Sequence, residues 1–190
     1  MEVIGLVLAA GGGSRFGGPK ALISWHGRLL VQHAVDTLTA AGVPDITVVL
    51  GADAALVRSR SPGLPRTVFN PDWATGLASS LRVGLAALAG SPAAAAVVLL
   101  VDMPGVTPDA IRRVVAIADT GVLAIGGYRD RRGHPVLLGR DHWSGVATTA
   151  TGDRGARDYL RAHPEQVRVV QVGDVADDYD IDVPADLHHA

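Results

Sequence analysis

The sequence predicts an α/β protein with a Rossmann-like three-layer α/β/α architecture around a mostly parallel sheet. Short apolar runs, typical of buried strands, alternate along the chain with segments whose apolar residues recur at helical spacing. Glycine accounts for 23 of the 190 residues and ends several of these segments. Since no linker and no internal repeat interrupts the alternation, we expect a single domain over residues 1–190.

The expected strands begin with Val3–Ala9, an almost continuous apolar run that ends at a cluster of glycines. The most apolar strand is expected at 94–101, directly before Asp102. The charged segment 128–134 predicts a turn that leads into the next strand. Further short apolar runs predict strands at 46–50, 67–69, 122–125, 135–138 and 167–172.

Helices are expected between these strands. Apolar residues at helical spacing stop at Gly42, which is a typical C-terminal signal of a helix. Thr107 followed by Pro108 provides an N-cap and a proline at the first helical position. Similar signals predict helices at 29–41, from about 53, and at 77–89, 108–118, 153–162 and 184–188.

Composition excludes several classes of protein. Hydrophobic residues make up 48% of the chain, which is too high a share for a disordered one. A formal net charge of −2 argues against a broad basic face, so no nucleic-acid partner is expected. Cysteine is absent, which excludes disulfides, thiolate nucleophiles and cysteine-ligated metals. The longest apolar run, 93–101, is about half a membrane span, and no basic leader precedes the first strand, so we expect no membrane association and a cytoplasmic location.

The loop after the first strand carries the clearest functional signal. Its glycines would let backbone amides approach phosphate oxygens closely, and Arg15 and Lys20 add positive charge. Lys20 is the only lysine of the chain, beside 16 arginines. The alternative is a flexible glycine-rich turn with surface cations. The residues expected to bind a nucleotide here are Leu8, Ala9, Ala10, Gly11, Gly12, Arg15 and Lys20.

Two common phosphate-binding motifs do not fit this loop. Lys20 follows Pro19 and precedes Ala21, whereas a Walker motif requires Gly-Lys-Ser/Thr. The dinucleotide fingerprint requires a third glycine where Phe16 stands. These departures argue against P-loop kinases and Rossmann dehydrogenases.

Carboxylates follow at two distant places. Asp102 would face the ligand crevice from the end of its strand, where Mg²⁺ on a nucleotide takes one or two carboxylates. Asp180 and Asp182 alternate, so they lie on one side of an extended segment and could share a metal with Asp102. The alternatives are a turn cap for Asp102 and a solvated acidic segment, with Asp182 as a cap, for the other pair.

Three further segments offer polar groups for a ligand. Thr75, Ser79 and Ser80 precede or open a helix, where they could hold a base, ribose or phosphate or could simply cap the helix. His134 could bind an acceptor phosphate or transfer a proton, although a histidine in a turn is more often structural. Arg154, or Arg157 nearby, could also receive an acceptor phosphate from the surface of a helix.

The first loop resembles that of nucleotidyltransferases, whose signature is L-A-x-G-x-x-x-R-x-G-x-x-K. Together with N-P-D-W at 70–73, D-M-P at 102–104, R-G-H-P at 132–135 and D-I-D-V-P at 180–184, it makes the chain similar to molybdenum cofactor cytidylyltransferases from Val7 to Leu187. One departure is Val101, where that family usually has glycine before the aspartate.

This resemblance implies a fold of the nucleotide-diphospho-sugar transferase type and a single nucleotidyltransferase domain over 1–190. The implied reaction transfers CMP from CTP to the terminal phosphate of the molybdopterin cofactor and releases pyrophosphate. Arg15, Lys20 and Asp102 would be catalytic, Asp102 and Asp182 would bind Mg²⁺, and His134 and Arg154 would face the acceptor.

The resemblance also implies a recipient of the product, either a molybdenum hydroxylase or its maturation factor. In this family Ala-Ala-Gly in the first loop accompanies cytidine and Ala-Gly-Gly accompanies guanosine, so Ala10 favours CTP. The alternatives are a transferase that uses GTP or a different phosphorylated acceptor, and a non-catalytic carrier of the molybdenum cofactor.

Overall fold

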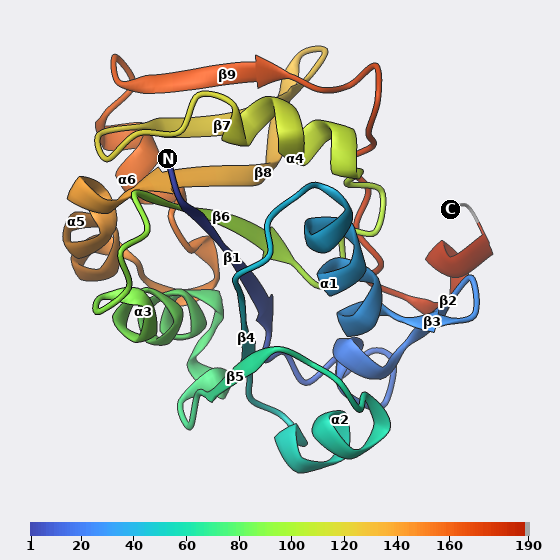
Figure 1. The fold of residues 1–190 in the computed structure, drawn as a ribbon. Coiled ribbons are helices and arrows are strands. Elements are labelled where there is room, and N and C mark those ends of the chain that lie inside the picture. Colours follow the sequence, from blue (N-terminus) through green and yellow to red (C-terminus); the bar gives the residue numbers. More distant parts are fainter. Residues whose placement is uncertain (189–190) are drawn as a thin grey trace.

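The computed structural model describes residues 1–188, and within them seven strands form one sheet (Figure 1). Every adjacent pair runs parallel except the two that involve β8, which is antiparallel to both of its neighbours. This confirms the predicted mostly parallel sheet. In spatial order the strands are β5 (Arg66–Phe69), β4 (Ile46–Leu50), β1 (Val3–Ala9), β6 (Ala95–Leu100), β8 (Arg131–Gly139), β7 (Leu123–Tyr128) and β9 (Val167–Gln171).

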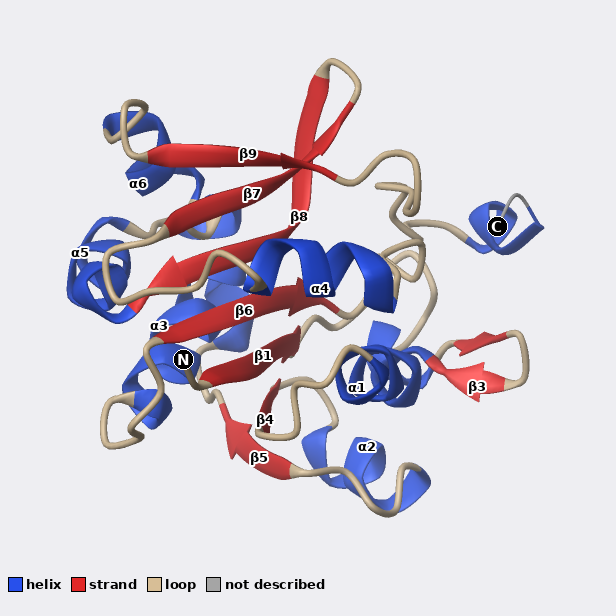
Figure 2. Ribbon diagram, turned by 45° about the horizontal axis from the view of Figure 1, so that its top comes forward, coloured by secondary structure: helices blue, strands red, loops and turns tan. Residues whose placement is uncertain are grey.

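Helices cover both faces of the sheet, which explains why its central strands are continuous apolar runs (Figure 2). One face packs against α1 (Leu30–Ala40), α2 (Ala54–Arg60) and α4 (Pro108–Val115). The other packs against α3 (Leu77–Leu88), α5 (Trp143–Thr149) and α6 (Arg157–Ala162). Alternate residues of β1 enter the two cores, with Val7 on the first face and Leu6 and Leu8 on the second.

The register of the central strands brings three loops to one edge of the sheet. Leu8 of β1 pairs with Val49 of β4 on one side and with Leu100 of β6 on the other. The three strands therefore end at the same level. The loops that follow them, which include the glycine-rich loop and Asp102, leave the sheet side by side.

The predicted turn at 128–134 is wrong, because most of that segment is strand. β7 continues to Tyr128 and β8 begins at Arg131, and these two residues are still paired in the ladder of the two strands. Only Arg129 and Asp130 separate the strands, and Arg129 has a positive φ of 55°. Charged side chains can point outward from a hairpin while its backbone ladder continues, so charge alone did not mark a turn.

Other boundaries also differ from the expectation. The helix predicted at 153–162 begins at Arg157, since Gly155 has a φ of 53° and separates it from a 3₁₀ turn, η4 (Gly152–Arg154). Sequence analysis missed α5 and the small hairpin of β2 (Ser24–Trp25) and β3 (Arg28–Leu29). Across residues 1–188, no helix combines the length and the apolarity that a membrane crossing requires.

The buried side chains of β1 should contribute strongly to the stability of the fold. Leu6 is 0% exposed, so Leu6→Ala should lower the free energy of unfolding by about 2–5 kcal/mol in urea titrations. Leu56→Ala is the matched control, because Leu56 on α2 is 44% exposed and its loss should cost within about 0.5 kcal/mol. Equal losses in the two variants would contradict this packing.

Candidate active site

The candidate site lies at the carboxyl edge of the sheet, where open α/β sheets bind their ligands. The glycine-rich loop leaves β1 there, and Asp102 stands two residues after the end of β6. The acidic segment near the C-terminus reaches the same place, because the Ile181 amide donates to the Asp102 carbonyl at 2.8 Å. Ile181 itself is fully buried, so it anchors Asp180 and Asp182 on either side.

Four predicted site residues meet in one cluster. Lys20 Nζ donates to Asp102 Oδ2 at 2.7 Å and also donates to Asp182 Oδ1. Arg15 Nη1 lies 3.8 Å from Asp182 Oδ2. The structure therefore brings together side chains that are separated by 82 and 162 positions in the sequence.

The electrostatics of this cluster keep Lys20 charged. Its side chain is only 17% exposed, and burial by itself would lower the pKa of the ammonium. Attraction to Asp102 and hydrogen bonds to Asp102 and Asp182 outweigh burial and raise the pKa of Lys20 above its usual value. Burial and the neighbouring carboxylates of Asp182 and Asp102 raise the pKa of Asp180.

The donor set of Asp102 and Asp182 fits a divalent cation that arrives with a nucleotide. Both carboxylates contact the same ammonium, so they can share one small cation. Within residues 1–188, no group of three or more histidine, cysteine, aspartate or glutamate side chains could hold a metal. Mg²⁺ on a nucleotide needs only one or two carboxylates, since water and phosphate oxygens complete its coordination.

The glycine-rich loop folds back on itself. The Gly13 carbonyl accepts hydrogen bonds from the Phe16 amide at 2.8 Å and from the Gly18 amide at 3.4 Å. Gly13 has a φ of 55°, and a Cβ at this position would collide with the Gly18 carbonyl. A glycine is therefore required at Gly13 for this shape of the loop.

Trp73, which sequence analysis did not single out, forms a wall beside this loop. A Cβ added to Gly12 would lie 2.9 Å from the Trp73 ring, and one added to Gly51 would collide with the Trp73 side chain. Ala10 is buried, and its carbonyl accepts from the Ala52 amide at 3.0 Å. The N-P-D-W motif was visible in the sequence, but its contact with the loop after β4 was not.

Ser79 and Ser80, which were expected to bind nucleotide, point instead into a buried network. The Asn70 side chain is fully buried and donates to Ser79 Oγ at 2.8 Å and to Ser80 Oγ at 3.0 Å. The two serines are 3% and 4% exposed. Thr75 Oγ1 donates to the Asp72 carbonyl at 2.7 Å. The two serine hydroxyls hold the N-P-D-W segment on α3, whereas Thr75 bonds only within its own turn, and none of the three is gathered with Lys20.

A cavity of about 780 Å³ adjoins the cluster, and both predicted acceptor residues, His134 and Arg154, line it. Leu8, Leu100 and Ile125 are among the apolar residues in its lining. The charged residues that line it are Asp153, Asp178, Asp180, Arg131, Arg132, Arg154, Arg157 and Arg161. A lining that combines apolar side chains with more arginines than aspartates suits a ligand that has a flat apolar body and an anionic group.

His134 enters the cavity as a neutral ring. Its Nδ1 lies 3.0 Å from the Val98 carbonyl, which can only accept, so Nδ1 carries the proton and Nε2 remains an acceptor. Burial lowers the pKa of His134. Arg154 forms an ion pair with Asp158 at 2.9 Å. Sequence analysis quoted Arg132 within the R-G-H-P motif but gave no role to it or to Arg131.

Comparison with known proteins identifies the family. The family model described as "MobA-like NTP transferase domain" matches residues 5–167. The chain belongs to this family. The predicted nucleotidyltransferase character and the fold type are thereby confirmed, whereas preference for a cytidine nucleotide stays a prediction.

Two curated relatives illustrate the range of this MobA-like family. Nicotine blue oxidoreductase of Paenarthrobacter nicotinovorans is 36% identical over 199 residues, which cover 98% of this chain and 95% of the relative. A protein named probable molybdenum cofactor guanylyltransferase, from Bacillus cereus strain ATCC 10987 / NRS 248, is 43% identical over 49 residues. That second match covers 26% of this chain and 24% of the relative.

A solved structure also matches the whole fold. Rv0371c from Mycobacterium tuberculosis H37Rv superposes with a TM-score of 0.85 at 29% identity, covering 100% of this chain and 96% of that one. A second structure of Rv0371c, in complex with manganese, has a TM-score of 0.80 at 28% identity and covers 100% of this chain and 97% of that one.

The buried network around Asn70 yields a prediction about the scaffold of the site. Asn70→Ala would leave buried serine hydroxyls without their donor, so it should lower the free energy of unfolding by about 1–3 kcal/mol. Thr75→Ala, at an exposed hydroxyl of the same segment, should change it by less than about 0.5 kcal/mol. Denaturant titration of both variants measures the difference, and equal values would show that the network does not hold the segment.

Proposed function

We propose that this MobA-like protein transfers CMP from CTP to the terminal phosphate of the molybdopterin cofactor and releases pyrophosphate. The observation that carries the proposal is the convergence of Lys20, Asp102 and Asp182 at the carboxyl edge of the sheet, beside a glycine-rich loop. On this proposal a molybdenum hydroxylase or its maturation factor receives the product.

The residues of the cluster suit such a transfer. The acceptor phosphate is ionised at neutral pH, so it can attack the α-phosphorus of the nucleotide without a strong general base. Lys20 and Arg15 would stabilise the negative charge that develops on the departing pyrophosphate. Asp102 and Asp182 would hold Mg²⁺, which when bound neutralises phosphate charge. The manganese complex of Rv0371c supports a divalent cation in this fold.

The adjoining cavity would take the acceptor. Its apolar lining residues suit a pterin ring, and its arginines suit the phosphate that the pterin carries. Arg154 would bind that phosphate, and His134 Nε2 would accept a hydrogen bond from the acceptor. The short match to a molybdenum cofactor guanylyltransferase is consistent with this class of acceptor.

Reduction of a heteroaromatic compound is a second candidate function, favoured by the 36% identity to nicotine blue oxidoreductase along almost the whole chain. Against it stands the first loop, in which Phe16 replaces the third glycine of a nicotinamide-dinucleotide fingerprint. Purified protein should therefore be assayed in parallel for pyrophosphate release and for oxidation of a reduced nicotinamide dinucleotide with nicotine blue. Oxidation of the reduced dinucleotide without pyrophosphate release would replace the proposed nucleotidyl transfer with the reductase function. Activity in neither assay would favour a non-catalytic carrier of the molybdenum cofactor.

Lys20 should be essential for turnover but not for folding. Lys20→Ala should reduce pyrophosphate release with CTP and molybdenum cofactor by about 10²–10³-fold, since it removes a preorganised charge from the leaving group. Arg112→Ala is the control, because Arg112 pairs with Asp109 on the surface. Wild-type turnover in a folded Lys20→Ala protein would remove Lys20 from the site.

Nucleotide choice should depend on Ala10. Ala10 is buried next to the wall formed by Trp73, so its methyl group should narrow the cradle for the base. We expect CTP to be preferred over GTP by about 10–200-fold, and Ala10→Gly to weaken that preference while retaining turnover. Product masses from equal mixtures of CTP and GTP measure the ratio, and a mainly guanine product from the wild type would overturn the cytidylyl assignment alone.

A further inference from the structure

The loop that carries Asp102 is fastened through its backbone carbonyls. The Asp102 and Gly105 carbonyls accept from the amides of Ile181 and Asp177, at 2.8 and 3.0 Å. The Met103 carbonyl accepts from the Val106 amide at 3.3 Å. The carbonyl between them, that of Pro104, takes its hydrogen bond from a side chain.

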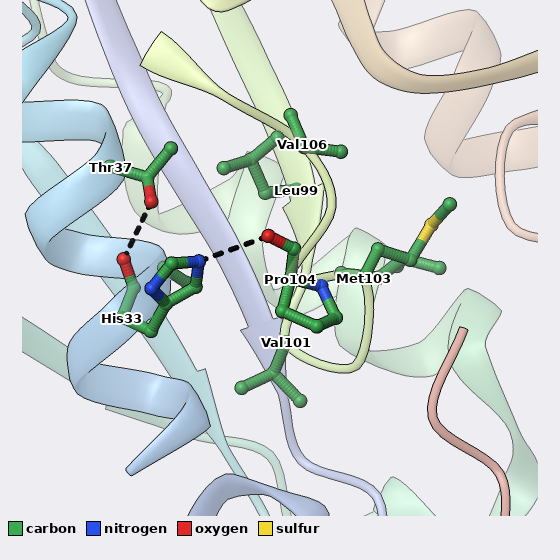
Figure 3. A pocket seen from close by; sticks show the side chains of 9 residues that line it. His33, Thr37, Leu99, Val101, Met103, Pro104 and Val106 are labelled. Carbon is green, nitrogen blue, oxygen red and sulfur yellow. Dashed lines mark hydrogen bonds between the residues drawn. The ribbon is translucent and has the colours of Figure 1, made fainter. Parts of the chain in front are cut away.

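That side chain is His33 of α1 (Figure 3). His33 Nε2 lies 3.1 Å from the Pro104 carbonyl oxygen, and because a carbonyl only accepts, Nε2 carries the proton and donates. The Thr37 hydroxyl in turn donates to the His33 carbonyl at 2.8 Å. The first contact ties the loop to the helix, two residues beyond Asp102.

Side chains do not fill the space between α1 and the loop that carries Asp102. A cavity of about 10 Å³, close to the least space that one water needs, lies between α1 and the loop. His33 and Pro104 both line it, together with Val101 and Met103 (Figure 3). The hydrogen bond from His33 therefore supplies a directional constraint that side-chain packing at this point does not.

His33 also reaches toward the segment that carries Lys20. Its ring lies edge-on against the Trp25 ring, with centroids 4.6 Å apart and an interplanar angle of 65°. Trp25 follows Lys20 by five residues, just after the 3₁₀ turn η1 (Lys20–Leu22). His33 therefore contacts both the loop that carries Asp102 and a residue five positions after Lys20, while Lys20 itself contacts Asp102.

We infer that His33 is a positioning residue that sets Asp102 against Lys20 through its contacts with Pro104 and Trp25. Its effect on turnover rests on the proposed nucleotidyl transfer, whereas its effect on the position of Lys20 does not. Burial lowers the pKa of His33, the hydrogen bond to the Pro104 carbonyl and the charge of Asp36 oppose that shift, and His26 and Arg28 add to it.

The single lysine of the chain provides a direct test without catalysis. In protein labelled with ¹⁵N-lysine, the side-chain resonance reports Lys20 alone and hence its contact with Asp102. His33→Leu should shift this resonance at fixed pH and lower kcat by up to about 10²-fold with little change in KM for the nucleotide. His33→Gln, whose amide can still donate to the Pro104 carbonyl, should return both toward the wild-type values.

His142→Leu is the matched control. Like His33, His142 bonds a backbone carbonyl and contacts an aromatic ring: its Nε2 lies 2.9 Å from the Gly121 carbonyl, and its ring lies edge-on to Tyr159. His142 stands just after the C-terminal end of β8, which pairs with the first residue of β6. It therefore lies at the edge of the sheet opposite the candidate site. This variant should lose stability without moving the Lys20 resonance or kcat.

An unchanged Lys20 resonance in His33→Leu, or an equal shift in His142→Leu, would overturn the inference. If His33→Leu does not fold, the Lys20 resonance is compared between His33→Asn and His33→Gln instead. The asparagine amide is too short to reach the Pro104 carbonyl, so only His33→Asn should shift the resonance. Failure of the wild type to release pyrophosphate would count against the proposed function alone, since the resonance would still report the position of Lys20.

Discussion

The candidate site at the carboxyl edge of the sheet depends on the ion pairs that the Lys20 ammonium forms with Asp102 and Asp182. Two partly buried carboxylates that both contact one ammonium repel each other, and this repulsion costs free energy unless a cation lies between them. Lys20 removes that cost and joins the glycine-rich loop, the end of β6 and the C-terminal segment. Its raised pKa follows from the same geometry, so the cation is retained at neutral pH.

The antiparallel strand β8 brings charged residues to the cavity beside this ion-pair cluster. In an entirely parallel sheet, the start of a strand lies at the edge opposite the ligand crevice. Because β8 runs against β6 and β7, its beginning lies beside their carboxyl ends, and so Arg131, Arg132 and His134 enter the cavity next to the cluster. The departure from parallel order therefore brings two of the five arginines of the lining to the cavity.

Continuous apolar runs predicted the central strands well, because burial on both faces allows hardly anything else. The same rule placed Lys20 and Asp102 at one edge, since strand ends of a parallel sheet meet there. It could not predict side-chain direction. Ser79 and Ser80 turn inward because Asn70, nine and ten positions away, offers a buried donor to both. The wall made by Trp73 and the hairpin at Arg129 likewise depend on contacts that no local pattern encodes.

Charge balance explains why cations are needed beyond the cluster if the proposed transfer takes place. Arg15 and Lys20 offset Asp102 and Asp182, so the four side chains together carry no formal net charge. A nucleoside triphosphate and a phosphorylated acceptor would add several negative charges at the same edge. The cluster cannot neutralise these by itself, because its cations are already engaged with carboxylates. Asp102 and Asp182 would hold a divalent ion in place of the ammonium, so that Lys20 could turn toward the phosphates. The cavity lining holds five arginines and three aspartates, and this excess of positive charge would balance part of the charge of the acceptor.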